Sequence, residues 1–187
     1  MQTQLALPEW TLRTNRTWIQ KLFIVLGTSC LIALLSRISI PLPFSPVPLA
    51  LGPHACLFVG ALLGSRLGAW SVLLYLFQGA IGLPVFALGQ GGLAVLMGPR
   101  GGYLIGYLIA AWLTGYLIEK SGAKTFRQTF SAMAIGNLVI YLCGLSQLSL
   151  FVGVEKAFYL GVFPFLIGDF LKLTAASNLL KKLSSRS

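Results

Sequence analysis

The sequence YLFQGAIGLPVFALGQGGLAVLMGPRGGYLIGY, from Tyr75 to Tyr107, decides how the rest of the chain can fold. It contains nine glycines and two prolines, and apolar segments flank it on both sides. Glycine allows positive φ and close backbone approach, whereas Pro84 and Pro99 end helices and fix the local turn. Between apolar helices, such a connection is tolerated at membrane depth only where protein or a cavity encloses it. The stretch therefore predicts a binding loop held between membrane-spanning helices.

The composition predicts an all-α membrane protein. Of the 187 residues, 56% are hydrophobic and 10% are charged, and the mean hydropathy is +0.83. In a typical soluble domain, about a quarter of the residues are charged. The length suits roughly six spans of about 20 residues each. We expect one compact bundle over residues 18–183, after an interfacial lead at 1–17 and before a basic tail at 184–187.

The six expected spans follow the apolar segments of the chain. They cover about 18–36, 54–63, 67–82, 101–119, a part of 130–150, and 158–180. Ser65 and Arg66 form the expected turn between the second and third spans, and residues 83–100 form the glycine- and proline-rich loop between the third and fourth. Five prolines fall between Ser39 and Pro53, so this segment is expected to be an extended loop.

The basic residues indicate how the chain lies in the bilayer. The net charge is +10, but the basic residues are unevenly distributed. With six spans, three basic loop residues fall on one side of the membrane, namely Arg37, Arg100 and Lys156. Ten fall on the other, namely Arg13, Arg16, Lys21, Arg66, Lys120, Lys124, Arg127, Lys181, Lys182 and Arg186. Positive residues favour the cytoplasmic side, so both termini are expected to be cytoplasmic, and no nucleic-acid partner is expected.

Two charged residues stand inside the last apolar segment. FPFLIGDFLK places Asp169 and Lys172 three residues apart on one helix face. Ionised groups in a membrane are costly unless they are paired or wet, so they are functional candidates by default. The alternative is a buried pair that only fixes the helix orientation. His54 is expected to be a solvated or helix-end histidine, and Asn137 to bond across helices or to point to a cavity.

Catalysis is poorly supported by the sequence. The acidic residues are Glu9, Glu119, Glu155 and Asp169, and we expect no second carboxylate or histidine beside Asp169 to complete an acid/base pair. The chain contains no G-x-x-x-x-G-K-[ST] motif for ATP. We therefore expect a binding protein that is not an enzyme, without a metal or cofactor. An intramembrane enzyme that uses Asp169 as an acid is the alternative from another class.

YLFQGAIGLPVF followed by GGLAVLMGPRGGYLIGY resembles the signature of the BioY family, the biotin-binding S components of energy-coupling-factor (ECF) transporters. The last span is similar too, because P-F-x-x-G-D-x-x-K in this family supplies an Asp and a Lys that take part in biotin binding. The resemblance implies high-affinity biotin binding from the outside and inward release by toppling of the S component in the bilayer. It also implies a plasma or inner membrane location. The implied partners are a transmembrane coupling subunit and two ABC ATPase subunits.

With biotin as ligand, several side chains acquire expected roles. Asp169 would accept hydrogen bonds from the ureido N–H groups, and Lys172 would donate to the ureido carbonyl or hold Asp169. Tyr103 would supply a ring face or a hydroxyl group. Backbone amides that are expected to reach the ligand are those of Gly91, Gly92, Gly101 and Gly102.

Three positions depart from the family pattern. Arg100 stands where threonine is usual, and its guanidinium would clamp the ligand carboxylate or be a surface charge. Ala50 and Gly52 replace a polar threonine and glutamine. These departures leave a second reading open, in which the chain binds another small vitamin-like solute.

A small-residue face marks the first span. In the family, an Ala-x-x-x-Ala face on this helix docks the coupling subunit, and here the corresponding residues are Ser29 and Ala33. Small residues four apart let helices approach closely. Docking of the coupling subunit and ordinary packing inside the bundle are both consistent with this pattern.

Overall fold

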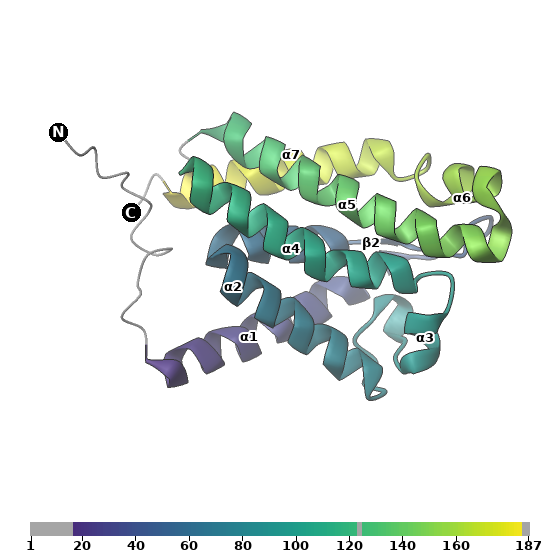
Figure 1. Ribbon diagram of the computed structural model, residues 1–187, viewed down its shortest axis with the longest axis horizontal. Coiled ribbons are helices and arrows are strands. Elements are labelled where there is room, and N and C mark those ends of the chain that lie inside the picture. The colour runs from purple at the N-terminus through teal and green to yellow at the C-terminus, as the bar shows by residue number, and fades with distance from the viewer. Residues whose placement is uncertain (1–16, 123–124, 185–187) are drawn as a thin grey trace.

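The computed structural model describes residues 17–122 and 125–184, which form a bundle of helices with one small hairpin (Figure 1). Most of the predicted lead and tail lies outside these residues. The helices are α1 (Trp18–Arg37), α2 (Gly52–Ala80), the 3-10 turn η1 (Ala87–Gly89), α3 (Leu93–Met97), α4 (Gly101–Ser121), α5 (Phe126–Val152), α6 (Val154–Gly161) and α7 (Leu166–Ser184). Strands β1 (Ser39–Ile40) and β2 (Leu49–Ala50) pair antiparallel, with Ser39 opposite Ala50.

Within the described residues, four helices are long and apolar enough to cross a membrane, namely α1, α2, α4 and α5. Helices α6 and α7 together would make a fifth span, bent by 48°. The prediction of one helix over 158–180 is wrong in this respect, because Val162–Phe165 separates α6 from α7. Pro164 lies in this break. Proline interrupts a helix because it has no N–H and its ring clashes with the preceding helical turn.

Helix α2 reverses direction at Gly64. The backbone there is non-helical, with φ 84° and ψ 177°, a conformation that L side chains rarely adopt. A Cβ on Gly68 would lie 2.7 Å from the Cα of Gly60, so the two halves of α2 pack against each other directly beyond the turn. Figure 1 shows them running in opposite directions. The turn comes one residue before the predicted one.

Glu119 of α4 caps the second half of α2. Its carboxylate accepts hydrogen bonds from the Ser65 backbone N–H and the Ser65 hydroxyl, both at 2.8 Å. An anion beside the first N–H groups of a helix is favourable. The reversal at Gly64 is therefore fastened from a neighbouring helix.

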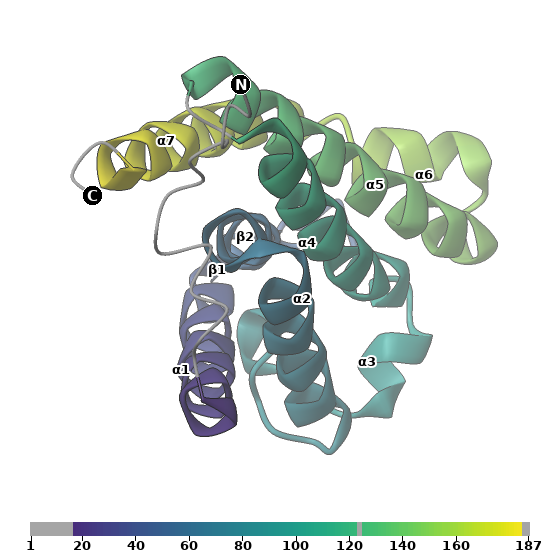
Figure 2. The ribbon, with the colours of Figure 1, turned by 60° about the vertical axis from the view of Figure 1, so that its left-hand side comes forward.

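Helix α4 occupies the middle of the bundle (Figure 2). Helices α1 and α2 lie on one side of it, and α5 and α7 on the other. Small residues of α4 make the contacts on both sides: Gly102 packs against the backbone of Cys143 in α5, and Gly115 packs against Ser65 in α2. Small side chains bring the helix backbones together, as expected for helices in a membrane.

The loops gather at one end of the bundle. The β1–β2 hairpin and the loop from Leu83 to Arg100 lie at the same end as the start of α4 (Figure 1). Arg37, at the end of α1, donates two hydrogen bonds to the carbonyl of Pro84, and the Leu88 N–H donates to the Ser39 hydroxyl. These bonds fix the glycine- and proline-rich loop to α1 and β1.

Candidate functional site

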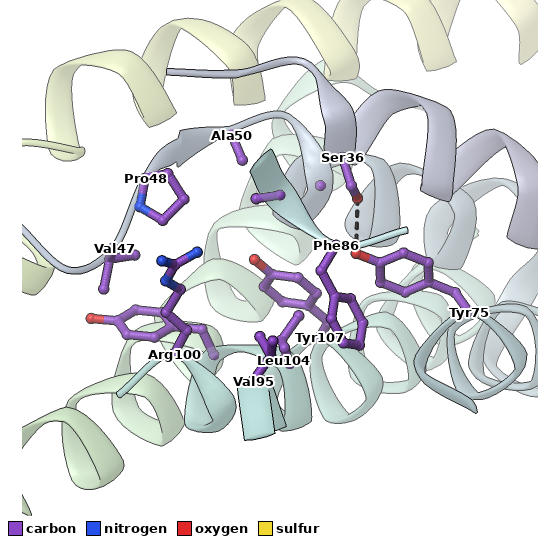
Figure 3. Close-up of a pocket in the computed structure, with 13 residues that line it drawn as sticks. Ser36, Val47, Pro48, Ala50, Tyr75, Phe86, Val95, Arg100, Leu104 and Tyr107 are labelled. Atoms are coloured by element: carbon purple, nitrogen blue, oxygen red, sulfur yellow. Dashed lines mark hydrogen bonds between the residues drawn. The ribbon is translucent and has the colours of Figure 1, made fainter. Parts of the chain in front are cut away.

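Two adjoining cavities lie beneath these loops. Their shared lining is Val47, Pro48, Ala50, Tyr103 and Tyr107. One cavity, of about 430 Å³, extends to Arg100 and to the Ser36–Tyr75 hydrogen bond (Figure 3). The other, of about 370 Å³, extends to Asp169 through Asn137 and Tyr141. Apolar and aromatic walls with a few polar groups are typical of small-molecule sites.

Asp169 is the centre of a polar cluster at one end of the site. Its Oδ2 accepts hydrogen bonds from Asn137 Nδ2 at 3.1 Å and from the Tyr141 hydroxyl at 2.5 Å. Its Oδ1 faces Lys172 Nζ at 3.7 Å and His54 Nε2 at 3.5 Å. The cluster is thus built from α2, α5 and α7, and within the described part of the chain an amide, a phenol, an ammonium and an imidazole face the carboxylate.

Lys172 connects this cluster to the hairpin. Besides its ion pair with Asp169, its ammonium donates a 3.4 Å hydrogen bond to the carbonyl of Ala50 in β2. Both side chains of the Asp169–Lys172 pair therefore contact residues that line the cavities. The prediction that the two share a helix face is confirmed.

The structure corrects the sequence prediction for His54. Its side chain is not solvated: the residue is 5% exposed and stands beside Asp169. The expectation that no histidine lies next to Asp169 is therefore wrong. The cause is the start of α2 at Gly52, which carries His54 inward in the first helical turn. The prediction that it lies at a helix end is confirmed.

Arg100 stands at the other end of the site. Its Nε donates to the Pro46 carbonyl at 2.7 Å and its Nη1 to Gln90 Oε1 at 3.0 Å. It therefore connects the proline-rich loop with the glycine-rich loop. Partial burial lowers the pKa of Arg100 below its usual value, but a guanidinium stays charged near neutral pH. Figure 3 shows the guanidinium on the cavity side, with Tyr107 between it and Phe86.

The ring of Tyr103 forms a wall shared by both cavities. Its hydroxyl donates a 3.0 Å hydrogen bond to the carbonyl of Gly161 at the end of α6. The hydroxyl is therefore engaged within the protein, and the ring face is the part of Tyr103 available to a ligand. Tyr107, one helical turn further along α4, was not predicted as a site residue.

The four glycines with predicted ligand-binding amides surround the site without lining either cavity. The N–H of Gly92 donates to the carbonyl of Gly79, and the N–H of Gly101 donates to the carbonyl of Gly98. Gly91 packs on the carbonyl of Leu83, and Gly102 packs on α5. The small size of Gly91, Gly101 and Gly102 allows close packing, whereas Gly92 takes a positive φ of 97°.

Ser29 and Ala33 lie on the inner side of α1. Ser29 has no exposed surface, and its hydroxyl accepts a hydrogen bond from Gln78 of α2. Ala33 packs against the core. Packing inside the bundle, one of the two interpretations of this pattern, accounts for the position of Ser29, and docking of the coupling subunit stays a prediction.

The structure adds functional candidates that the sequence did not single out. Tyr141 and Gln90 contact Asp169 and Arg100, and Phe86 and Phe165 line the cavities. A signal existed for Tyr141, because it lies four residues after Asn137 and so on the same helix face. For the other three, nothing in the spacing separates cavity from core.

Comparisons with known proteins agree with this architecture. The family model described as "BioY family" matches residues 3–187. "Probable biotin transporter BioY" of Pyrococcus horikoshii is 40% identical over 148 residues, which cover 79% of this chain and 87% of the relative. "Biotin transporter BioY" of Thermotoga maritima is 38% identical over 148 residues, covering 77% and 86%.

A solved structure is similar over nearly the whole chain. It is described as "Crystal structure at 2.1 A of the S-component for biotin from an ECF-type ABC transporter". The TM-score is 0.82 at 26% sequence identity, and the match covers 90% of this chain and 93% of the other. With a family model that matches from residue 3 to residue 187, this chain belongs to the BioY family.

Proposed function

We propose that this chain takes up biotin as the substrate-binding S component of an ECF-type ABC transporter. One observation carries the proposal: an apolar, aromatic site has a carboxylate–ammonium cluster at one end and a guanidinium at the other. Biotin has the matching order of groups: the ureido group at one edge of its bicycle, the apolar remainder of the bicycle, and an anionic tail. The BioY relatives and the solved S component for biotin support the same ligand.

The ureido group would occupy the end of the site near Asp169. The carboxylate accepts from the ureido N–H groups, and Lys172 either donates to the ureido carbonyl or keeps Asp169 in place. The bicyclic body lies between the rings of Tyr103 and Tyr107, where apolar contact is available. Of the described residues, Tyr103 and Tyr107 are the aromatic residues that line both cavities. The rest of the shared lining comes from β2 and the proline-rich loop.

The valerate carboxylate would bind Arg100. The Nε and Nη1 groups of Arg100 donate hydrogen bonds to Pro46 and Gln90, whereas Nη2 has no partner among the described residues. Arginine pairs well with carboxylates because its planar fork presents several donors. We infer that Gly91, Gly101 and Gly102 support this end by letting the loop pass close to its neighbours, and that Gly92 supports it through its positive φ.

We infer that the site faces away from the cytoplasm and that both termini are cytoplasmic. The start of α1, the turn of α2, the end of α4, the start of α5 and the end of α7 lie at the end of the bundle opposite the loops (Figure 1). These segments carry the basic residues Lys21, Arg66, Lys120, Arg127, Lys181 and Lys182. Arg37, Arg100 and Lys156 belong to the cavity end. The positive-inside tendency supports this orientation in a cell membrane. With α2 counted as two helices about Gly64 and the α6–α7 pair as one span, six segments cross.

We propose that transport requires a transmembrane coupling subunit and two ABC ATPase subunits. The chain has no P-loop of its own to use ATP. Release would occur inward by toppling of the S component. Helix α1 supports contact with a coupling subunit or lipid through the exposed apolar side chains Leu22, Phe23, Leu26 and Leu34.

Titration calorimetry of the purified protein with biotin tests the proposal. Wild-type protein should bind tightly, and Asp169→Asn and Lys172→Ala should each lose about ten-fold or more, because charged hydrogen bonds are worth about 1.5–3 kcal/mol. Lys156→Ala is the matched control, since it removes an exposed lysine at the same end of the molecule. A folded wild-type sample without affinity for biotin would refute the proposal and favour another vitamin-like ligand.

A further inference from the structure

His54 has a position that the proposed function does not explain. It is the single histidine of the chain. It is buried, with 5% exposure, and neither ring nitrogen has a hydrogen-bond partner among the described residues. It lines neither cavity, yet its Nε2 lies 3.5 Å from Asp169 Oδ1.

The two oxygens of Asp169 are served unequally. Oδ2 holds close donors from Asn137 and Tyr141, and both of these residues line the cavity. Among the described residues, Oδ1 has the more distant His54 Nε2 and Lys172 Nζ as neighbours, at 3.5 and 3.7 Å. A buried imidazole without a partner therefore stands beside a carboxylate oxygen without a close donor. Buried polar groups are nearly always hydrogen-bonded, so each group supplies what the other lacks.

The chemistry of imidazole decides the direction of this contact. A neutral imidazole carries one N–H and one lone pair. With the proton on Nε2, an N–H faces Asp169 Oδ1, whereas the other tautomer would oppose two lone pairs. Asp169 and Lys172 already balance each other in charge, so a neutral donor adds a hydrogen bond without adding an unpaired charge to a buried site.

We propose that His54 is a positioning residue for ligand binding: its Nε2–H closes onto Asp169 Oδ1 and fixes the carboxylate for the ligand. This inference rests on the proposed function in one respect, namely that Asp169 receives the ureido group. The sequence of residues 50–54 supports this role. Ala50 and Gly52 have no polar side chain, and His54 is the polar residue of these five that reaches Asp169.

The test begins with NMR of protein labelled with ¹⁵N-histidine and purified through a tag without histidine. Since the chain has one histidine, the two ring nitrogen signals belong to His54. We expect the Nε2–H tautomer, a change of the Nε2 signal on addition of biotin, and loss of that change in Asp169→Asn. An Nδ1–H tautomer, or ring signals that biotin leaves unchanged, would overturn the proposal.

Affinity measurements complete the test. His54→Leu should weaken biotin binding about ten-fold, or ~1.4 kcal/mol, whereas His54→Gln, which keeps an N–H donor at similar reach, should stay within about three-fold. Equal losses in both variants would show a packing role and contradict the proposal. If wild-type protein does not bind biotin, the proposed function fails. In that case the tautomer in wild type and in Asp169→Asn still decides whether His54 donates to Asp169.

Discussion

A methyl group added at Gly144 should impair the ligand site from behind. Gly144 lies in α5 and packs against the ring of Tyr103. A Cβ there would meet the ring atoms Cδ1 and Cε1 at 2.3 Å, whereas ordinary van der Waals contacts begin near 3.4 Å. The ring must therefore move by roughly 1 Å. Because α5 stands behind it, the movement is toward the cavities that the ring lines.

The size of the effect follows from two contributions. Overpacking of a closely packed site costs about 1–3 kcal/mol. The displaced ring also strains the buried hydrogen bond from the Tyr103 hydroxyl to the Gly161 carbonyl, which is worth about 1 kcal/mol. If the ligand has to push the ring back, Gly144→Ala should lose about 2–4 kcal/mol of binding free energy, at least about 30-fold in Kd.

The assay is calorimetric titration with biotin alongside a thermal unfolding curve in the same detergent. Gly27→Ala is the matched control, because Gly27 is also a helical glycine but a Cβ there meets nothing within 4 Å. Its Kd should stay within about two-fold of wild type. In the double variant Gly144→Ala with Tyr103→Leu, thermal stability should recover since the clash is gone. Wild-type affinity and stability in Gly144→Ala would refute the reasoning.

Three further predictions concern the charged groups. Wild-type protein should prefer biotin to biotin methyl ester by about 10–100-fold, and Arg100→Lys, which loses the planar fork, should reduce this preference at least about three-fold; an unchanged ratio in competition binding would contradict the role of Arg100. Glu119→Ala removes the cap on Ser65 and should lower unfolding stability by about 1–3 kcal/mol while biotin affinity is kept, so an unchanged melting temperature would count against that cap. Asp169→Asn leaves the Lys172 ammonium unpaired, and adding Lys172→Met should restore about 1–3 kcal/mol of unfolding stability, a recovery whose absence would show that the ion pair contributes little.

The backbone plan could be predicted from the sequence because glycine, proline and charge act locally. The reversal at Gly64 and the loop before Gly101 follow from residues that end helices or permit positive φ. The break at Pro164 had the same kind of signal, but the apolar residues around it suggested one continuous span. Pro164 alone was enough to predict this break, but the prediction of one span gave more weight to the hydropathy pattern than to the proline.

The site was predictable only in part. Asp169 and Lys172 stand out because a charge in an apolar helix is costly wherever that helix packs. The burial of His54 depends on how α2 packs against α7, and its distance of 115 residues along the chain from Asp169 leaves no pattern to read. The glycines show the reverse difficulty. A glycine that lets backbones touch and one that lets a ligand approach give the same letter in the sequence.

The polar cluster around Asp169 also affects how the protein is made. Alone, α7 is not among the helices apolar enough to cross a membrane, and it carries an acid and a base three residues apart. Near the centre of a span, each such residue opposes insertion from the translocon by about 2.5–3.5 kcal/mol, and both stand near the middle of the α6–α7 pair. Asn137 and Tyr141 belong to α5, which is synthesised earlier and is already present when α7 emerges. We therefore expect the residues proposed to bind the ligand to stabilise the last helix during membrane insertion as well, so that integration of α7 would depend on a bundle that is already assembled.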